Sequence, residues 1–226
     1  MENAKVTIIT PTLGRNSLNN LIDSIKIQKI PIKHLILWDI NRDITSDKDP
    51  SIYETFDVDY SSNCIVINDD MINGSAKSSA LISAGLMMVT TDYVTFADDD
   101  VIWEENHLNS LLETVKNKKW AFSKRKMWTK ISNDQYEFLG IDEFESLGDE
   151  AKTVYKSIDN NSLIFERRFG TSAACIYRET KEQNKDILIY EFLSKYAGEP
   201  GRTRMATINR VCSSRLAPYF RSNCVR

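Results

Sequence analysis

The sequence predicts an α/β fold in which helices flank a mainly parallel sheet. Short apolar stretches typical of buried strands alternate with amphipathic stretches typical of helices through the first half of the chain. Strands that alternate with helices in this way pair in parallel through right-handed crossovers. With 226 residues, 42% of them hydrophobic and 27% charged, the chain is large enough to bury one substantial core. We therefore expect a single domain, residues 1–226, with residues 1–116 and 117–226 as its two halves.

The expected elements of the first half follow one another in chain order. After Ser17, a residue type that favours helix caps, apolar residues recur at helical spacing, and two later segments repeat this spacing. The expected strands are residues 5–10, 34–39, 64–68 and 92–97, and the expected helices are residues 17–28, 80–88 and 108–115. The polar, acidic stretch 41–62 is expected to form a loop.

Beyond residue 116 this rhythm changes. Residues 120–131 and 135–139 predict a β-hairpin around the turn residues Ser132, Asn133 and Asp134, and an acidic, irregular stretch follows. The remaining expected elements are strands at 162–165 and 170–178, a helix at 185–196 and a last helix at 202–215. Irregular segments of this kind contact a bound molecule more often than they build a core. We therefore expect a smaller region of different character in this half.

The most informative motif is Asp98-Asp99-Asp100, which directly follows the apolar strand 92–97. In open α/β sheets, ligands bind at the carboxyl edge, where this strand ends. Neighbouring carboxylates repel one another unless a cation is present, and their hard oxygens suit Mg²⁺, Mn²⁺ or Ca²⁺. The alternative interpretation is a polar strand end with an aspartate cap on the next helix. The motif therefore predicts either a cation site or a capping turn.

Other segments stand around this motif in a characteristic order. Residues 8–15 read Ile-Ile-Thr-Pro-Thr-Leu-Gly-Arg, Trp38-Asp39 closes the second strand, and a helical stretch leads to the acidic strand. In order and spacing, residues 5–115 resemble the nucleotide-binding half of GT-A glycosyltransferases, especially those of family 2. Residues 170–178 more weakly resemble a later core strand of these enzymes. The resemblance implies a GT-A (Rossmann-like) fold, with residues 1–116 as the nucleotide-sugar-binding half and residues 117–226 as the acceptor-side half.

The resemblance also implies a reaction and a cofactor. It implies an inverting hexosyl- or deoxyhexosyltransferase that moves a sugar from a UDP- or dTDP-sugar to a glycan or lipid-linked acceptor. Mn²⁺ or Mg²⁺ is the implied cofactor, because a metal ion neutralises the diphosphate as the glycosidic bond breaks. By this resemblance Asp98 faces the ribose or the metal ion, Asp100 is the direct metal ligand and Asp99 assists.

The nucleobase side of the implied site comes from the first two strand ends. Thr10, Pro11 and Thr12 lie against the base, and Asp39 accepts the imide N–H of uracil or thymine. Arg15 contacts the base or the phosphate. The alternatives are a strand-ending turn at the proline and a helix cap at Asp39. This chain departs from the family pattern at 75–80, where Lys77 replaces the positive charge of a missing Ala-Arg-Asn sequence.

An inverting enzyme also needs a carboxylate that takes the proton of the acceptor hydroxyl. By resemblance, Asp186 and Glu191 are the nearest matches, and Glu191 is slightly preferred because Asp186 equally suits a helix cap. Neither stands in the usual Glu-Asp pair. Family members often recruit a third metal contact, sometimes a histidine, from the C-terminal half. The two histidines here, His34 and His107, lie in the first half, where we expect a structural and a solvent-facing role.

The C-terminal segment is basic. Residues 201–226 contain six arginines and no Asp, Glu or Lys, so the preceding 200 residues carry a net charge of -9 in a chain of -3. Arginine forks bind phosphate oxygens, which indicates contact with a diphosphate, a phospholipid-linked acceptor or an anionic membrane. Arg202 and Arg204 follow a glycine- and proline-containing break, and we expect them to close over the donor. The alternative is a solvated helix face. We expect no nucleic-acid partner.

Composition indicates a cytoplasmic enzyme. The four cysteines, Cys64, Cys175, Cys212 and Cys224, form no CxxC pair, which favours free thiols over a zinc site or disulfides. The chain begins without a signal segment, and its longest apolar run is too short to span a bilayer. We expect it to be cytoplasmic, with possible peripheral contact at a membrane. Two alternatives stay open: a sugar nucleotidyltransferase, and a non-catalytic module that binds a nucleotide-sugar or a glycan.

Overall fold

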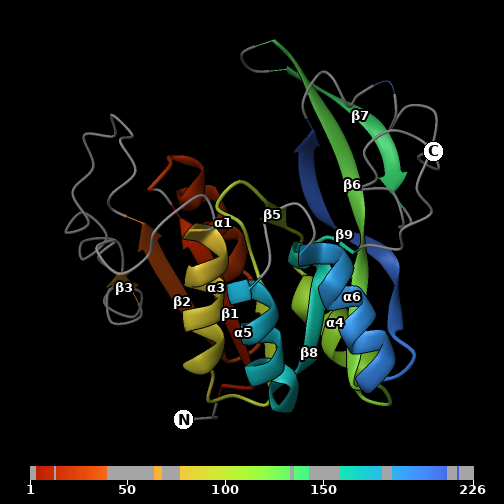
Figure 1. The fold of residues 1–226 in the computed structure, drawn as a ribbon. Coiled ribbons are helices and arrows are strands. Elements are labelled where there is room, and N and C mark those ends of the chain that lie inside the picture. Colours follow the sequence, from red (N-terminus) through yellow and green to blue (C-terminus); the bar gives the residue numbers. More distant parts are fainter. Residues whose placement is uncertain are drawn as a thin grey trace.

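The computed structural model describes residues 4–12, 14–39, 64–67, 77–132, 135–142, 158–179 and 185–212, with residue 218 (Figure 1). Nine described strands form one sheet in the order β3-β2-β1-β4-β8-β6-β9-β5, and β7 pairs with β6. The strands are β1 (Val6–Thr12), β2 (Ile32–Asp39), β3 (Cys64–Ile67), β4 (Tyr93–Phe96), β5 (Ile102–Trp103), β6 (Trp120–Ser132), β7 (Gln135–Asp142), β8 (Leu163–Glu166) and β9 (Gly201–Cys212). The α-helices are α1 (Ser17–Lys26), α3 (Lys77–Met87), α4 (His107–Val115), α5 (Gly170–Glu179) and α6 (Lys185–Tyr196). The short helices η3 (Asn160–Ser162) and η4 (Arg167–Phe169) flank β8.

The first half of the sheet is parallel, as the sequence predicts. β1 pairs in parallel with β2 on one side and with β4 on the other, and β2 pairs in parallel with β3. Every residue of β1 is buried, which fits a central strand covered on both faces. The carboxyl ends of β1, β2 and β4 therefore meet at one edge of the sheet.

Helices cover both faces of the sheet, so the fold has three layers (Figure 1). On one face, apolar residues of α3, α5 and α6 pack on one core cluster around Phe96, Phe122 and Phe165. On the other face, apolar residues of α1 and α4 pack on a second cluster around Ile8 and Ile164. The predicted α/β fold with a helix-flanked sheet is confirmed.

The second half of the sheet is mixed. β8 runs antiparallel to both β4 and β6, β9 runs parallel to β6, and β5 runs antiparallel to β9. β6 and β7 form the predicted hairpin, which extends beyond the helical layers in Figure 1. The strand expected at 162–165 and the helix expected at 185–196 are confirmed as β8 and α6.

Two expected elements are wrong in type. Residues 170–178, expected as a strand, form helix α5, whose Ala173, Ala174 and Tyr177 bury one helical face in the core. Residues 202–212, expected as a helix, form most of strand β9, which pairs along β6. β9 is rich in the β-branched residues that favour strands. Among the described residues, no helix is both long and apolar enough to cross a membrane.

Candidate active site

The acidic motif turns its middle residue inward. Asp99 is only 4% exposed, and its carboxylate accepts a hydrogen bond of 2.7 Å from Thr12 Oγ1 at the end of β1. Arg15 donates to the same carboxylate from 3.3 Å. Thr12 Oγ1 in turn accepts from the backbone N–H of Gly14, which has a φ of 76° that favours glycine. Asp99 therefore fastens the β1 end to the β4 end and stabilises the edge of the sheet.

The outer residues of the motif face solvent. The side chains of Asp98 and Asp100 are 45% and 52% exposed. Asp98 Oδ2 accepts a hydrogen bond of 2.8 Å from Asn161 Nδ2, and the Asp98 N–H donates to Asn161 Oδ1. Asp100 lies 4.0 Å from Arg15. Two carboxylates are thus presented together at the carboxyl edge of β4.

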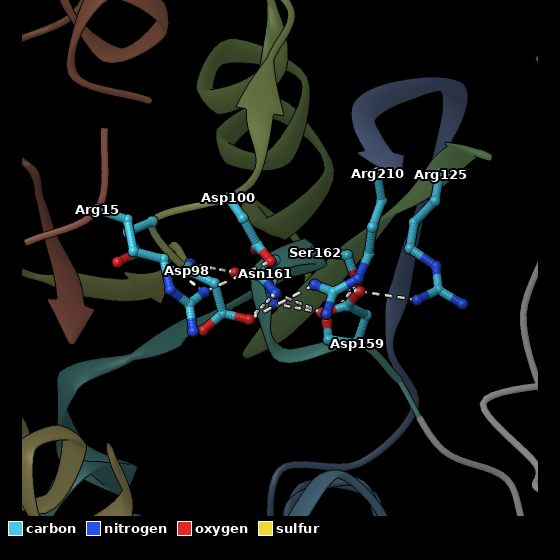
Figure 2. A network of polar contacts seen from close by, with 9 residues as sticks. Arg15, Asp98, Asp100, Arg125, Asp159, Asn161, Ser162 and Arg210 are labelled. Atoms are coloured by element: carbon cyan, nitrogen blue, oxygen red, sulfur yellow. Dashed lines mark hydrogen bonds and ion pairs between the residues drawn. The ribbon is translucent and has the colours of Figure 1, made fainter. Parts of the chain in front are cut away.

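A buried polar network lies next to Asp98 and joins the two halves of the sheet (Figure 2). Arg125 of β6 donates to Asp159 from 2.7 Å and also to Asp142, and all three side chains are 5% exposed. Asp159 Oδ1 accepts from the backbone and the side chain of Asn161 at 3.0 and 2.7 Å. Arg210 of β9 bridges Asp159 and Asp98 at 3.2 and 3.4 Å.

The network changes the acidities of its carboxyl groups. Although burial alone would raise it, Arg210 and Arg125 hold the pKa of Asp159 well below its usual range. Although the Asp98 side chain is 45% exposed, its partial removal from water beside the buried network raises its pKa, and Arg210 and Asn161 offset only part of that rise. Asp159 therefore stays ionised and anchors both arginines, since a buried charge needs such partners.

Asp186, at the start of α6, is a second carboxyl group with a shifted acidity. Burial raises the pKa of Asp186 to about 7, and repulsion from Asp159 and Asp98 adds to the rise. The Tyr177 hydroxyl is buried without a hydrogen-bond partner among the described residues, and burial together with Asp186 raises its pKa. A carboxyl group with a pKa near neutrality, close to an acidic strand end, is suited to proton transfer.

The available carboxylates fit a divalent ion that is shared with the substrate. In the part of the chain that the structure describes, no three His, Cys, Asp or Glu side chains are grouped to hold a metal ion. Asp98 and Asp100 nevertheless offer half-exposed carboxylate oxygens on one edge. This arrangement fits Mg²⁺ or Mn²⁺ held by one or two carboxylates together with substrate phosphates, and not an ion enclosed by protein ligands.

The predicted nucleobase residues have mixed outcomes. Thr10 is buried and its hydroxyl is hydrogen-bonded to His34 at 2.8 Å, so its side chain is not available to a base. Pro11 is also buried in β1. Asp39 is the last residue of β2 and Lys77 is the first residue of α3, but their side chains lie outside the described residues. Their proposed roles stay predictions.

The structure does not bring every candidate to this edge. Glu191 is exposed on α6. Arg202 and Arg204 stand near the start of β9, in a strand and not in a flexible loop, and Arg202 lies over the Phe122 ring at 5.6 Å. A strand rises about 3.3 Å per residue, so Arg204 and Arg202 lie roughly 20 and 26 Å along β9 from Arg210. The expected loop closure by these two arginines is therefore not supported by the fold.

His107 corrects a further expectation. It is fully buried beside Trp103 and hydrogen-bonded to Thr207 at 2.8 Å, and it does not face solvent. Burial lowers the pKa of both His34 and His107 to about 3. Both histidines are therefore neutral structural residues. The side chains of two of the four cysteines, Cys175 and Cys212, are described, and both are thiols outside any disulfide.

Four residues of the network were missed by the sequence interpretation: Arg125, Asp159, Asn161 and Arg210. Arg125 stands in a strand pattern in which a charged side chain indicates the solvent face. In the sequence, Arg210 is distinguished only as one of several arginines of the basic C-terminal segment. The one local signal is the polar run Asp159-Asn160-Asn161-Ser162 directly before an apolar strand.

Comparisons with known proteins agree with this geometry. A family model described as "Glycosyl transferase family 2" matches residues 7–181. Among solved structures, S. aureus TarS 1–349 superposes with a TM-score of 0.63 at 13% identity, covering 92% of this chain and 60% of that one. TarS 1–349 in complex with UDP gives 0.62 at 17% identity, covering 92% and 61%.

A third structure, TarS 1–349 in complex with UDP-GlcNAc, gives a TM-score of 0.56 at 16% identity, covering 92% of this chain and 58% of that one. At these identities the likeness shows a shared fold. The chain spans about three fifths of the length of the TarS 1–349 structures. No curated protein sequence matches the chain.

Proposed function

The chain belongs to glycosyl transferase family 2, and we propose that it is a metal-dependent, inverting enzyme that moves a sugar from a UDP- or dTDP-sugar to a glycan or lipid-linked acceptor. The observation that carries the proposal is the carboxyl edge of β4. There, Asp98 and Asp100 present two half-exposed carboxylates, and Asp98 lies within electrostatic reach of Asp186, whose pKa is raised to about 7 by burial. A site for a donor diphosphate and a candidate base therefore adjoin one another.

The donor would lie along the ends of β1 and β2. Backbone groups of Thr10 to Thr12 contact the base in this proposal, and Asp39 at the end of β2 accepts its imide N–H. Arg15 is half-exposed beside the acidic motif, where it can reach a phosphate. The TarS structures with UDP and with UDP-GlcNAc support a uridine nucleotide donor through the shared fold.

Asp98 and Asp100 are the proposed metal ligands, and a Mn²⁺ or Mg²⁺ ion bound there would supply positive charge to the diphosphate leaving group. Asp99 supports them indirectly, because its hydrogen bonds to Thr12 and Arg15 fix the turn that carries both neighbours.

Asp186 is the proposed general base. It accepts the proton of the acceptor hydroxyl while that oxygen attacks the anomeric carbon from the side opposite the leaving diphosphate, which inverts the configuration. Its raised pKa matches a base that works near neutral pH. Sequence interpretation slightly preferred Glu191, but the geometry favours Asp186, since Glu191 is exposed on α6. The raised pKa of Asp186 also favours an enzyme over a non-catalytic binding module.

We also propose that the enzyme works in the cytoplasm, with peripheral contact between its basic C-terminal segment and a membrane. Arg202 and Arg204 are the described arginines of that segment whose side chains are exposed. The arginine-rich composition supports this contact.

The test of the function measures UDP binding with and without Mn²⁺ by calorimetry. The native protein should bind UDP more tightly with Mn²⁺ and more tightly than CDP, because cytosine offers no imide N–H. Asp100→Ala should remove the gain that Mn²⁺ gives. Asp23→Ala, which removes an exposed carboxylate of α1, is the matched control and should keep that gain. Unchanged UDP affinity in Asp100→Ala with Mn²⁺ would show that the metal assignment is wrong.

A further inference from the structure

Arg210 lies between the acidic motif and the buried network (Figure 2). Its Nη1 atom is 3.4 Å from Oδ2 of Asp98 and 3.2 Å from Oδ2 of Asp159, and its side chain is 28% exposed. A guanidinium group carries five N–H donors in a planar fork. Among the described residues, Arg210 contacts Asp98 and Asp159 through Nη1 alone. The rest of the fork can therefore bind a further anion.

The position of Arg210 is fixed by a rigid carboxylate. Asp159 is held by Arg125 through its Oδ2 atom and by Asn161 through its Oδ1 atom. Its backbone oxygen accepts from both the N–H and the hydroxyl of Ser162, at 2.9 and 2.7 Å. An anchor with so many hydrogen bonds holds the guanidinium in one place without rearrangement on ligand binding.

Arg125 provides an internal comparison. Its two terminal nitrogens both donate to buried carboxylates, Asp159 and Asp142, and it is 5% exposed. Its charge is compensated inside the protein. Arg210 shares Asp159 with Arg125, but it reaches the surface beside a half-exposed carboxylate. Of these two arginines, Arg210 is therefore the one that can meet a substrate.

Arg210 also lies beside the proposed donor site. It contacts Asp98, one of the two proposed metal ligands at the carboxyl edge of β4, at 3.4 Å. A guanidinium group at this edge adjoins the proposed position of the diphosphate, where the leaving oxygen departs from the sugar. That oxygen belongs to the β-phosphate of a nucleoside diphosphate sugar.

We propose that Arg210 binds the β-phosphate of the donor and that this contact needs no divalent ion. The inference rests on the proposed function. Guanidinium forks match phosphate oxygens in two parallel hydrogen bonds, so Arg210 adds a fixed positive charge to whatever charge a metal ion at Asp98 and Asp100 supplies. As the bond between the anomeric carbon and the phosphate oxygen breaks, the oxygen keeps the electron pair, and Arg210 stabilises the negative charge that develops there.

The experiment compares UDP with UMP in the presence of EDTA, by calorimetry. UMP lacks the β-phosphate, so the UDP-to-UMP affinity ratio reports contacts to that group alone. The native protein should favour UDP, and Arg210→Ala should lower the ratio on the order of 10- to 100-fold, the range of charge-assisted hydrogen bonds. Arg168→Ala is the matched control, since it removes an exposed arginine paired with Glu166 at the opposite edge of the sheet.

Arg210→Lys is a second variant in case the alanine variant does not fold. The lysine keeps a positive charge beside Asp159 but lacks the planar guanidinium group. It should retain part of the UDP preference and a native unfolding transition. Equal affinities of the native protein for UDP and UMP in EDTA would overturn the inference. A UDP-to-UMP affinity ratio equal to that of the native protein in both Arg210 variants would also overturn it. A native protein that binds neither nucleotide, with or without Mn²⁺, would instead refute the proposed function.

Discussion

Asp186 shows how a site residue can oppose folding while it serves a reaction. Burial is the first cause of its raised pKa, and the nearby Asp159 and Asp98 carboxylates strengthen the effect against the opposing charges of Arg210 and Arg125. Ionisation of the Asp186 carboxyl group is therefore less favourable in the folded protein than in the unfolded chain. A base with a pKa near neutrality is consequently obtained at a loss of folding stability.

Asp186→Asn should stabilise the protein at pH 8 and abolish sugar transfer. A carboxyl group whose folded pKa exceeds its unfolded value binds protons more tightly when folded, so its contribution to stability falls as pH rises from about 4 to about 7. The asparagine variant lacks this fall. In EDTA at pH 8 we expect a gain on the order of 1 to 3 kcal/mol, which raises the melting temperature by about 2 to 4 °C per kcal/mol.

Melting curves at pH 5 and pH 8 check this sign. The difference between native protein and variant should be larger at pH 8. A variant that is less stable than the native protein at both values would show that Asp186 is a stabilising helix cap. Glu191→Gln is the comparison for activity, because it alters the other candidate base on the same helix, and loss of transfer there with retention in Asp186→Asn would reverse the assignment.

At this scale the sequence could locate single residues but not their partners. The acidic motif and Asp186 follow from local patterns and from the family resemblance. Arg125 and Arg210 do not, because each meets Asp159 only through strand pairing between segments far apart in the chain. A buried arginine and an exposed arginine look the same in a strand pattern. Their roles are decided by the carboxylates that the fold brings beside them.

At the scale of elements, β9 is both the least predictable strand and the one that carries Arg210. Its seven residues from Arg204 to Arg210 do not alternate strictly between apolar and polar side chains. Its arginines are compatible with the solvated face of a helix. Pairing with β6 in parallel overrides that local signal, because hydrogen bonds and packing across strands decide strand formation more than propensity does. For α5 the sequence predicts a strand, but Ala173, Ala174 and Tyr177 stand at helical spacing and pack into the core as one face of a helix.

Gly201→Ala tests the placement of β9 against α4. A Cβ atom at Gly201 would lie 2.6 Å from Thr114 Cγ2 and 2.9 Å from the Thr114 backbone oxygen. Because a backbone atom cannot rotate away, we expect a loss on the order of 1 to 3 kcal/mol of stability. Chemical denaturation measures this loss as a lower midpoint with an unchanged slope.

Gly170→Ala is the matched control for this prediction. Its Cβ atom would meet only the Leu86 backbone oxygen at 3.7 Å, an ordinary contact, and its φ of -60° suits any residue at a helix start. Its stability should stay equal to that of the native protein or rise by up to about 1 kcal/mol, because alanine favours helices over glycine. Equal stabilities of the two variants would contradict the close approach of β9 to α4.

At the scale of the whole molecule, the site spans the boundary between the parallel and the mixed halves of the sheet. The parallel strands β1 and β4 supply Thr12 and the acidic motif, while the segment before β8 and the mixed strands β6 and β9 supply the network. That boundary is the antiparallel pairing of β4 with β8. A ligand bound at this edge therefore contacts both halves of the sheet and stabilises them together.

UDP with Mn²⁺ should consequently protect both halves from hydrogen exchange, but only at the carboxyl edge of β4. Protection is expected near Arg15, in the acidic motif, at 158–162 and around Arg210. The far end of β4, where Tyr93, Glu166 and Arg167 line a separate pocket of about 590 Å³, should show no ligand-specific protection. At a UDP concentration 100 times its Kd, stability should rise by about 2.7 kcal/mol, and the melting temperature by about 5 to 10 °C. Protection confined to the β1 and β4 ends, with none at 158–162 or Arg210, would mean that the nucleotide is held by the parallel half alone and that the network only supports the fold.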